Sequence, residues 1–238
     1  MARAPLIGPL IAPRVGPLVG IVDSGGPADQ MEGARAFDAQ GDGPATPDRL
    51  GHGSAVAAVL RRAAPGAALR HAQVFTDTPV TSADRVARAV LWLAAEADII
   101  LLSLGLAADR AVLRAACETA LAAGRCLVAA APARGGAAFP AAYPGVLAAT
   151  GDARCGWDDL SLLPGPASSP ASGPVIGAWC ASPERGGAGM AGASLAAARV
   201  AGHLAADFPE ARADPAAWLA ARCRITGPER RLAPAGQA

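Results

Sequence analysis

The alternation of short apolar runs with segments of helical length constrains the fold of this chain more than any other feature of its sequence. The runs predicted to be buried strands are 18–23 (LVGIVD), 68–75 (ALRHAQVF), 98–104 (DIILLSL), 125–130 (RCLVAA) and 146–150 (VLAAT). The segments predicted to be helices are 52–63, 83–96, 108–123, 194–206 and 215–223. Strands that alternate with helices are typical of a mostly parallel central sheet with crossover helices on its faces. The sequence therefore predicts an α/β fold.

One domain is expected to contain this sheet. A chain of 238 residues of which 52% are hydrophobic has enough apolar surface for a single core, and we assign residues 1–226 to it. Two stretches rich in Pro, Gly and Ser, 161–174 and 182–192, are predicted to be loops. The last segment, 227–238, shows no periodicity and is predicted to be a disordered tail.

Charge and terminal sequence argue against several classes of protein. The formal net charge is +1 and the arginines are scattered, so no surface for nucleic acid is predicted. The apolar N-terminus is interrupted by four prolines and lacks the continuous core of a signal peptide. The alanine-rich stretch 108–131 carries too many charges for a membrane helix. We therefore expect a soluble, cytoplasmic protein with no membrane partner.

Cysteine usage points to a reducing compartment. The five cysteines are odd in number, widely spaced and free of CxxC pairs. This spacing favours neither a disulfide framework nor a zinc site, and no metal site is predicted.

Three segments carry residues suited to a hydrolytic site. Asp23 ends the apolar run VGIVD, which places a carboxylate at the carboxyl edge of the predicted sheet, where α/β enzymes keep their sites. His52 lies between Gly51 and Gly53 at the start of a helical pattern, so its ring can project from a sharp turn. Ser194 follows a glycine-rich approach and begins a helix, where unpaired backbone N–H groups and the helix dipole stabilise a developing negative charge.

Each residue type also has a plainer interpretation. An aspartate at a strand end is often a cap, and a serine at a helix start is often an N-cap. His71 lies in a strand pattern and His203 in a helical pattern, and both are interpreted as structural or surface histidines. A Gly-x-Gly-x-x-Gly string at Gly187, Gly189 and Gly192 follows a loop instead of a strand, so it does not predict a dinucleotide fold.

The motifs and their order resemble those of the subtilisin-like serine proteases. That family carries an Asp strand, then Gly-His-Gly-Thr-x-Val-Ala, then Gly-Thr-Ser-Met-Ala-x-Pro-x-Val-Ala-Gly; this chain has VDSG, GHGSAVA and GASLAAARVAG in the same order. DIILLSLG resembles the substrate-binding strand of the family, and FPAAYPGVLAATG resembles its Pro-Ala-x-x-Pro-x-Val segment. The similarity spans about residues 18–205 and implies a subtilisin-like three-layer fold with helices on both faces of the sheet.

The resemblance also implies roles for the site residues. Ser194 would attack a peptide carbonyl, His52 would take its proton and return it to the leaving amine, and Asp23 would hold the imidazole in the required tautomer. No cofactor is needed for this chemistry. Ser103 and Gly105 match the substrate-binding strand of the family.

The oxyanion hole departs most from the family pattern. Where relatives carry Ala-Ala-Gly-Asn, this chain has AAAPARGG with Pro132 and Ala133 at the Gly-Asn positions, and it contains no asparagine anywhere. Loss of that donor in a well-studied member of the family slows catalysis by about 10²–10³, which leaves a slow enzyme. Arg134 is a candidate substitute donor, and a solvated loop arginine is the alternative. The backbone N–H of Ser194 is expected to remain in place.

Two functions from different classes are consistent with these motifs. The first is an intracellular endopeptidase that removes a leader peptide from a specific substrate. Residues 1–22 leave no room for the propeptide of secreted relatives, and the chain is similar to small subtilisin-like proteases that mature peptides. One of these processes the crosslinked small subunit of quinohemoprotein amine dehydrogenase, so the partners would be that leader-bearing subunit and its radical-SAM modifying enzyme. The second is a binding or scaffold protein that keeps the fold after losing efficient catalysis.

Overall fold

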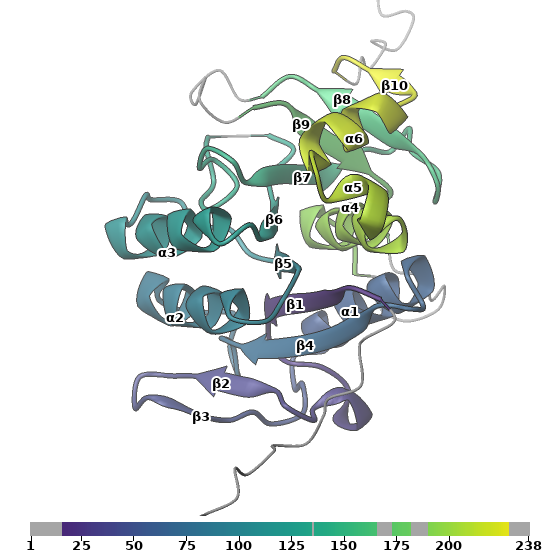
Figure 1. Ribbon diagram of the computed structural model, residues 1–238. Coiled ribbons are helices and arrows are strands. Elements are labelled where there is room, and N and C mark those ends of the chain that lie inside the picture. The colour runs from purple at the N-terminus through teal and green to yellow at the C-terminus, as the bar shows by residue number, and fades with distance from the viewer. Residues whose placement is uncertain (1–15, 135, 166–172, 182–189, 229–238) are drawn as a thin grey trace, which may run out of the picture.

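The strands assemble into one mixed sheet in the computed structural model, which describes residues 16–134, 136–165, 173–181 and 190–228 (Figure 1). The strands are β1 (Leu18–Asp23), β2 (Arg35–Phe37), β3 (Asp42–Pro44), β4 (Ala68–Gln73), β5 (Ile99–Leu102), β6 (Cys126–Ala130), β7 (Leu147–Gly151), β8 (Leu160–Leu163), β9 (Val175–Ala178) and β10 (Ile225–Thr226). Their order is β10-β8-β9-β7-β6-β5-β1-β4-β2-β3. Only the pairs β2 with β3 and β8 with β9 are antiparallel among the described residues.

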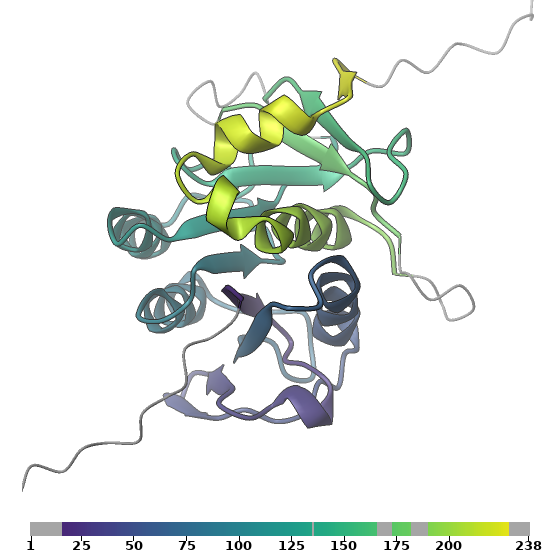
Figure 2. The ribbon, with the colours of Figure 1, turned by 45° about the vertical axis from the view of Figure 1, so that its right-hand side comes forward.

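Helices cover both faces of this sheet. They are the 3₁₀ helix Ala28–Gln30, α1 (His52–Ala63), α2 (Ala83–Ala94), α3 (Ala111–Ala122), α4 (Ala193–Ala206), α5 (Phe208–Ala211) and α6 (Pro215–Arg222). Figures 1 and 2 show α2 and α3 on one face and α1 and α4 on the other. The three-layer α/β fold predicted from the sequence is confirmed.

The sheet has a hydrophobic core on each face, and alternate residues of the central strands point into one core or the other. In β1, Val19 and Ile21 pack with the residues of α1 and α4, whereas Leu18 and Val22 pack with those of α2 and α3. All six residues of β1 are buried, as expected for a parallel strand covered on both faces. Consequently the first strand is fixed from both sides, and so is the aspartate that ends it.

A close contact between α1 and α4 brings together the two helices that begin near His52 and Ser194. A Cβ atom added to Gly202 in α4 would lie 2.4 Å from the Cβ of Ala63 in α1, so only glycine permits this approach. The two helices therefore pack more tightly than larger side chains would allow.

The structure corrects the sequence prediction at several short elements. Residues 161–163 belong to β8 instead of the predicted loop, because the apolar LSLL run pairs antiparallel with β9 despite its Pro- and Ser-rich neighbours. The strands β2, β3, β9 and β10 and the helix α5 were not predicted, since two to four residues are too few to show a period. Residues 166–172, 182–189 and 229–238 lie outside the described residues, and with them Gly187, Gly189 and most of the predicted tail.

No helix within the described ranges is long and apolar enough to cross a membrane.

Candidate active site

Asp23 is the last residue of β1 and lies at the carboxyl edge of the sheet. Its side chain is buried, and its Oδ1 accepts hydrogen bonds from the backbone N–H of Ser24 at 2.6 Å and from the Ser24 hydroxyl at 3.2 Å. The Ser24 hydroxyl oxygen in turn accepts from the N–H of Gly53 at 2.9 Å. Ser24 thus connects the end of β1 to the first turn of α1.

His52 is the first residue of α1, directly after Gly51 in the left-handed region at φ 76°. Its Nδ1 lies 2.8 Å from Oδ1 and 2.9 Å from Oδ2 of Asp23. A proton on Nδ1 satisfies this contact and leaves Nε2 with a lone pair on the opposite side of the ring. The hydrogen bond to Asp23 raises the pKa of His52 above 6.5, burial opposes this shift, and the charges of Asp23 and Asp48 add to it.

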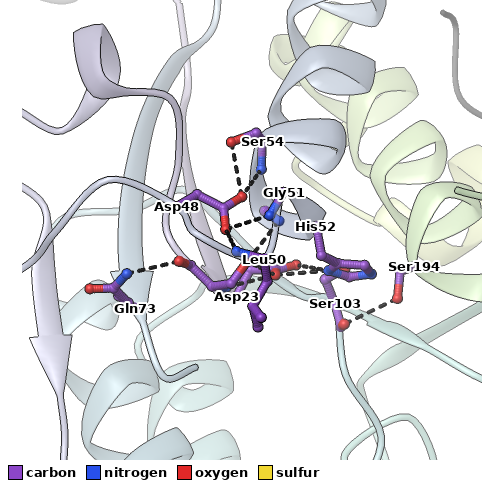
Figure 3. Close-up of polar contacts among 11 residues, drawn as sticks. Asp23, Asp48, Leu50, Gly51, His52, Ser54, Gln73, Ser103 and Ser194 are labelled. Carbon is purple, nitrogen blue, oxygen red and sulfur yellow. Dashed lines mark hydrogen bonds and ion pairs between the residues drawn. The ribbon is translucent and has the colours of Figure 1, made fainter. Parts of the chain in front are cut away.

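Ser194 lies in the first turn of α4, which follows Gly192 at φ 139°. Figure 3 shows the His52 ring between the carboxylate of Asp23 and the hydroxyl of Ser194. The Ser194 hydroxyl donates to the backbone carbonyl of Ser103 at 3.1 Å, and among the described residues no hydrogen bond joins it to His52. The structure therefore brings the three predicted residues together with the serine hydroxyl turned toward Ser103.

Two hollows share lining residues in the segment that follows β5. One, of about 490 Å³, is lined by Ser194, Ala193 and several alanines, and the other, of about 440 Å³, is lined by Asp23 and His52 with apolar neighbours. Gly105 lines both hollows and Ser103 lines the second. The two predicted substrate-binding residues of this segment thus lie beside the predicted catalytic residues.

The other two predicted residues lie elsewhere. Ala133 and Arg134 are exposed and line a smaller cavity of about 170 Å³ together with Thr150. Pro132 lines the hollow of Ser194, whereas neither Ala133 nor Arg134 is among the described residues that line it. The place of Ala133 in the oxyanion hole and the role of Arg134 as a substitute donor stay predictions. The first amides of a helix lack intrahelical partners, so the backbone N–H of Ser194 is available for a negative charge.

Sequence reasoning missed a supporting residue, Asp48. Its carboxylate accepts hydrogen bonds from the segment around His52, as Figure 3 shows. A signal for this residue was present, because Asp followed by Gly three positions later is typical of a turn that the Asp side chain caps.

The pKa of each remaining histidine shifts in the opposite direction to that of His52. His71 is buried in β4, and burial lowers its pKa. His203 lies in α4, and burial, with a contribution from Arg199, lowers its pKa to about 4. Within the part of the chain that the structure describes, no group of three or more His, Cys, Asp or Glu side chains is placed to hold a metal ion.

Comparisons with known proteins identify the fold and no closer relative. No protein-family model matches the sequence, and no curated protein matches it. Solved structures do match: S41 psychrophilic protease (TM-score 0.67, 20% identity, 89% of this chain and 85% of that chain) and sphericase (0.63, 20%, 84% and 80%). A cold adapted subtilisin-like serine proteinase gives a TM-score of 0.62 at 17% identity, over 81% of this chain and 75% of that chain. The chain thus has the subtilisin-like α/β fold.

Proposed function

We propose that this chain is a serine endopeptidase in which Ser194 is the nucleophile, His52 the general base and Asp23 the acid that orients the base. The observation that carries the proposal is the contact of His52 Nδ1 with both carboxylate oxygens of the buried Asp23, on the ring edge opposite Ser194. Such a pair fixes the tautomer that can accept a proton at Nε2.

The proposed reaction follows from these positions. The Ser194 hydroxyl rotates about its Cα–Cβ bond from Ser103 toward His52, and its oxygen bonds to the peptide carbonyl carbon while its proton passes to Nε2. The carbonyl oxygen becomes negative beside the N–H of Ser194. The peptide C–N bond then breaks, and His52 gives the proton to the leaving amine. Water then enters where the amine has left, gives a proton to His52 and attacks the acyl carbon. The ester bond to Ser194 breaks, His52 returns the proton to the serine oxygen, and the acyl group leaves as a carboxylic acid.

A narrower proposal concerns the substrate, which we take to be a leader-bearing peptide. It is supported by the resemblance of the motifs to small subtilisin-like proteases that mature peptides, and its partners would be the crosslinked small subunit and the radical-SAM enzyme named above. The two hollows beside Ser103–Gly105 are lined mostly by apolar residues and offer room for side chains of an extended peptide.

Intact-mass spectrometry of two substrates tests both levels of the proposal. Incubation with the crosslinked subunit is expected to release the leader by one cut, and casein is expected to stay intact, with Ser194→Ala inactive on both. Rapid degradation of casein would contradict the narrow specificity. Cleavage that persists in Ser194→Ala would contradict the role of the serine.

A scaffold function is the second candidate, and two observations favour it. The Ser194 hydroxyl is hydrogen-bonded to Ser103 instead of His52, and Pro132 stands in the hollow where relatives of this family pattern place a donor. If the protein is a scaffold, wild type and Ser194→Ala are expected to bind the leader-bearing subunit with the same affinity and to leave it uncleaved. Calorimetric titration of both proteins, together with the mass measurement, separates the two functions.

A further inference from the structure

One carboxylate holds the backbone on both sides of His52. Oδ1 of Asp48 accepts from the N–H of Leu50 and of Gly51, each at 2.9 Å, before the histidine. Oδ2 accepts from the N–H of Ser54 at 2.8 Å and from its hydroxyl at 2.9 Å, after the histidine. Four hydrogen bonds from a single side chain therefore enclose the residue that carries the imidazole (Figure 3).

The same residue is anchored to the segment that carries Asp23. The backbone N–H of Asp48 donates to the carbonyl of Gly26 at 3.0 Å, in the loop that follows β1. The buried Gln73 adds a second connection, because its amide donates to the carbonyl of Ser24 at 2.8 Å while its oxygen accepts from the N–H of Thr46 at 3.0 Å. Asp48 therefore joins the loop after Asp23 to the helix that begins at His52.

Helix α1 depends on this bridge because it lacks a cap of its own. Its N-cap residue is Gly51, which has no side chain to accept from the first amides. The Ser24 hydroxyl accepts from Gly53 and the Asp48 carboxylate accepts from Ser54, so two distant side chains replace the usual cap. The position of His52 at the start of the helix is thus set by residues outside the helix.

The bridge also carries charge. Burial raises the pKa of Asp48, but hydrogen bonds to its carboxylate, those from Ser54 and Gly51 among them, outweigh it and hold that pKa below 3.8. The negative charge of this carboxylate beside His52 stabilises the imidazolium and contributes to the raised pKa of that residue.

We propose that Asp48 is a positioning residue for the serine hydrolase reaction, holding the His52 imidazole against Asp23. This inference rests on the proposed function, since it assigns the geometry of the general base to a residue that does not touch the substrate. Loss of Asp48 loosens the turn at His52, and small misplacements of a reacting group cost large factors in rate.

Asp48→Asn tests the inference with a matched control, Asp38→Asn. The carboxylate of Asp38 accepts hydrogen bonds from the backbone amides two and three residues later, those of Gln40 and Gly41. Asp48 makes the same local pattern with Leu50 and Gly51, but the turn at Asp38 is exposed. NMR titration of the three histidine Cε1–H signals reports the pKa of His52 without any need for activity. We expect Asp48→Asn to lower it by about half a pH unit, since a nearby negative charge is removed, and Asp38→Asn to leave it unchanged.

The rate of labelling by a fluorophosphonate gives the second readout. Asp48→Asn is expected to slow it by about 10–100-fold while Asp38→Asn matches wild type. If Asp48→Asn does not fold, Ser54→Ala, which removes one of the four hydrogen bonds, replaces it with an expected loss of about threefold.

The outcomes separate the two proposals. The inference about Asp48 would be overturned if Asp48→Asn kept both the labelling rate of wild type and an unshifted His52 pKa. If Ser54→Ala has to replace that variant, a wild-type labelling rate in Ser54→Ala would overturn it. No labelling in any folded variant would overturn the proposed function, and the titration alone would then decide whether Asp48 controls the basicity of His52.

Discussion

At the scale of single residues, the contact between Asp23 and His52 determines the pH dependence of the proposed reaction. The hydrogen bond to Asp23 raises the pKa of His52 above 6.5. His52 accepts a proton only when it is neutral, so the rate must fall as the pH drops through this raised pKa. When the rate of fluorophosphonate labelling is plotted against pH, we expect the midpoint of its fall on the acid side to lie above pH 6.5.

Asp23→Asn is the variant that tests this cause. The substitution removes the negative charge and the fixed tautomer of His52. The fall in labelling rate is therefore expected to occur at lower pH, and the maximal labelling rate is expected to be about 10⁴-fold lower. A wild-type midpoint at or below pH 6.5 would show that Asp23 does not stabilise the imidazolium.

Much of the candidate site was predictable from single residues, and the reason is local. Asp23, His52 and Ser194 each stand where a strand ends or a helix begins, and such ends meet at one edge of a parallel sheet. The positions of Ala133 and Arg134 were not predictable in this way. They are exposed and lie in an irregular loop, where neither a strand end nor a helix start fixes the position of a side chain.

At the scale of elements, the contact between α1 and α4 sets the distance between the helices that carry His52 and Ser194. Gly202→Ala places a methyl group against Ala63, and such overpacking costs about 1–3 kcal/mol. We expect the melting temperature to fall by roughly 2–4 °C per kcal/mol, with a parallel loss in labelling rate.

Ala63→Gly in the same chain is the compensating change. It removes the methyl group that the new one meets, so the double variant is expected to recover the labelling rate of wild type. A double variant as slow as Gly202→Ala would show that the contact with Ala63 is not the cause.

Long helices and central strands could be predicted from the sequence, whereas short strands could not. The central strands showed clear apolar runs and the long helices clear periods, and α2 begins after Ser82, whose hydroxyl accepts a hydrogen bond from the N–H of Arg85. Short outer strands such as β2 and β8, each one strand in from an edge of the sheet, owe their conformation to pairing with a neighbour, which leaves too little pattern in the sequence.

At the scale of the whole molecule, the buried histidines make the fold sensitive to acid. The pKa of His203 is lowered to about 4 in the folded chain, against 6.5 when unfolded. Between these values the unfolded chain binds a proton that the folded chain does not, so stability falls as the pH drops from 6.5 toward 4. The loss from this residue reaches about 3 kcal/mol at most.

His203→Leu removes this proton uptake. We expect the free energy of unfolding, measured with urea, to fall less between pH 7 and pH 4.5 in His203→Leu than in wild type. His71 is also buried with a lowered pKa, so part of the acid sensitivity is expected to remain. Equal losses in variant and wild type would contradict the role of His203.

The likeness of the whole molecule to solved proteases lies in its fold, at identities of 17–20%. The account of its activity therefore depends on one serine. Mass spectrometry of the folded protein after treatment with a fluorophosphonate tests that serine most directly. We predict one adduct, located by fragmentation at Ser194, absent from Ser194→Ala and retained in Ser82→Ala, which removes an N-cap serine elsewhere. No adduct on the wild-type protein, or an adduct that persists in Ser194→Ala, would contradict the account.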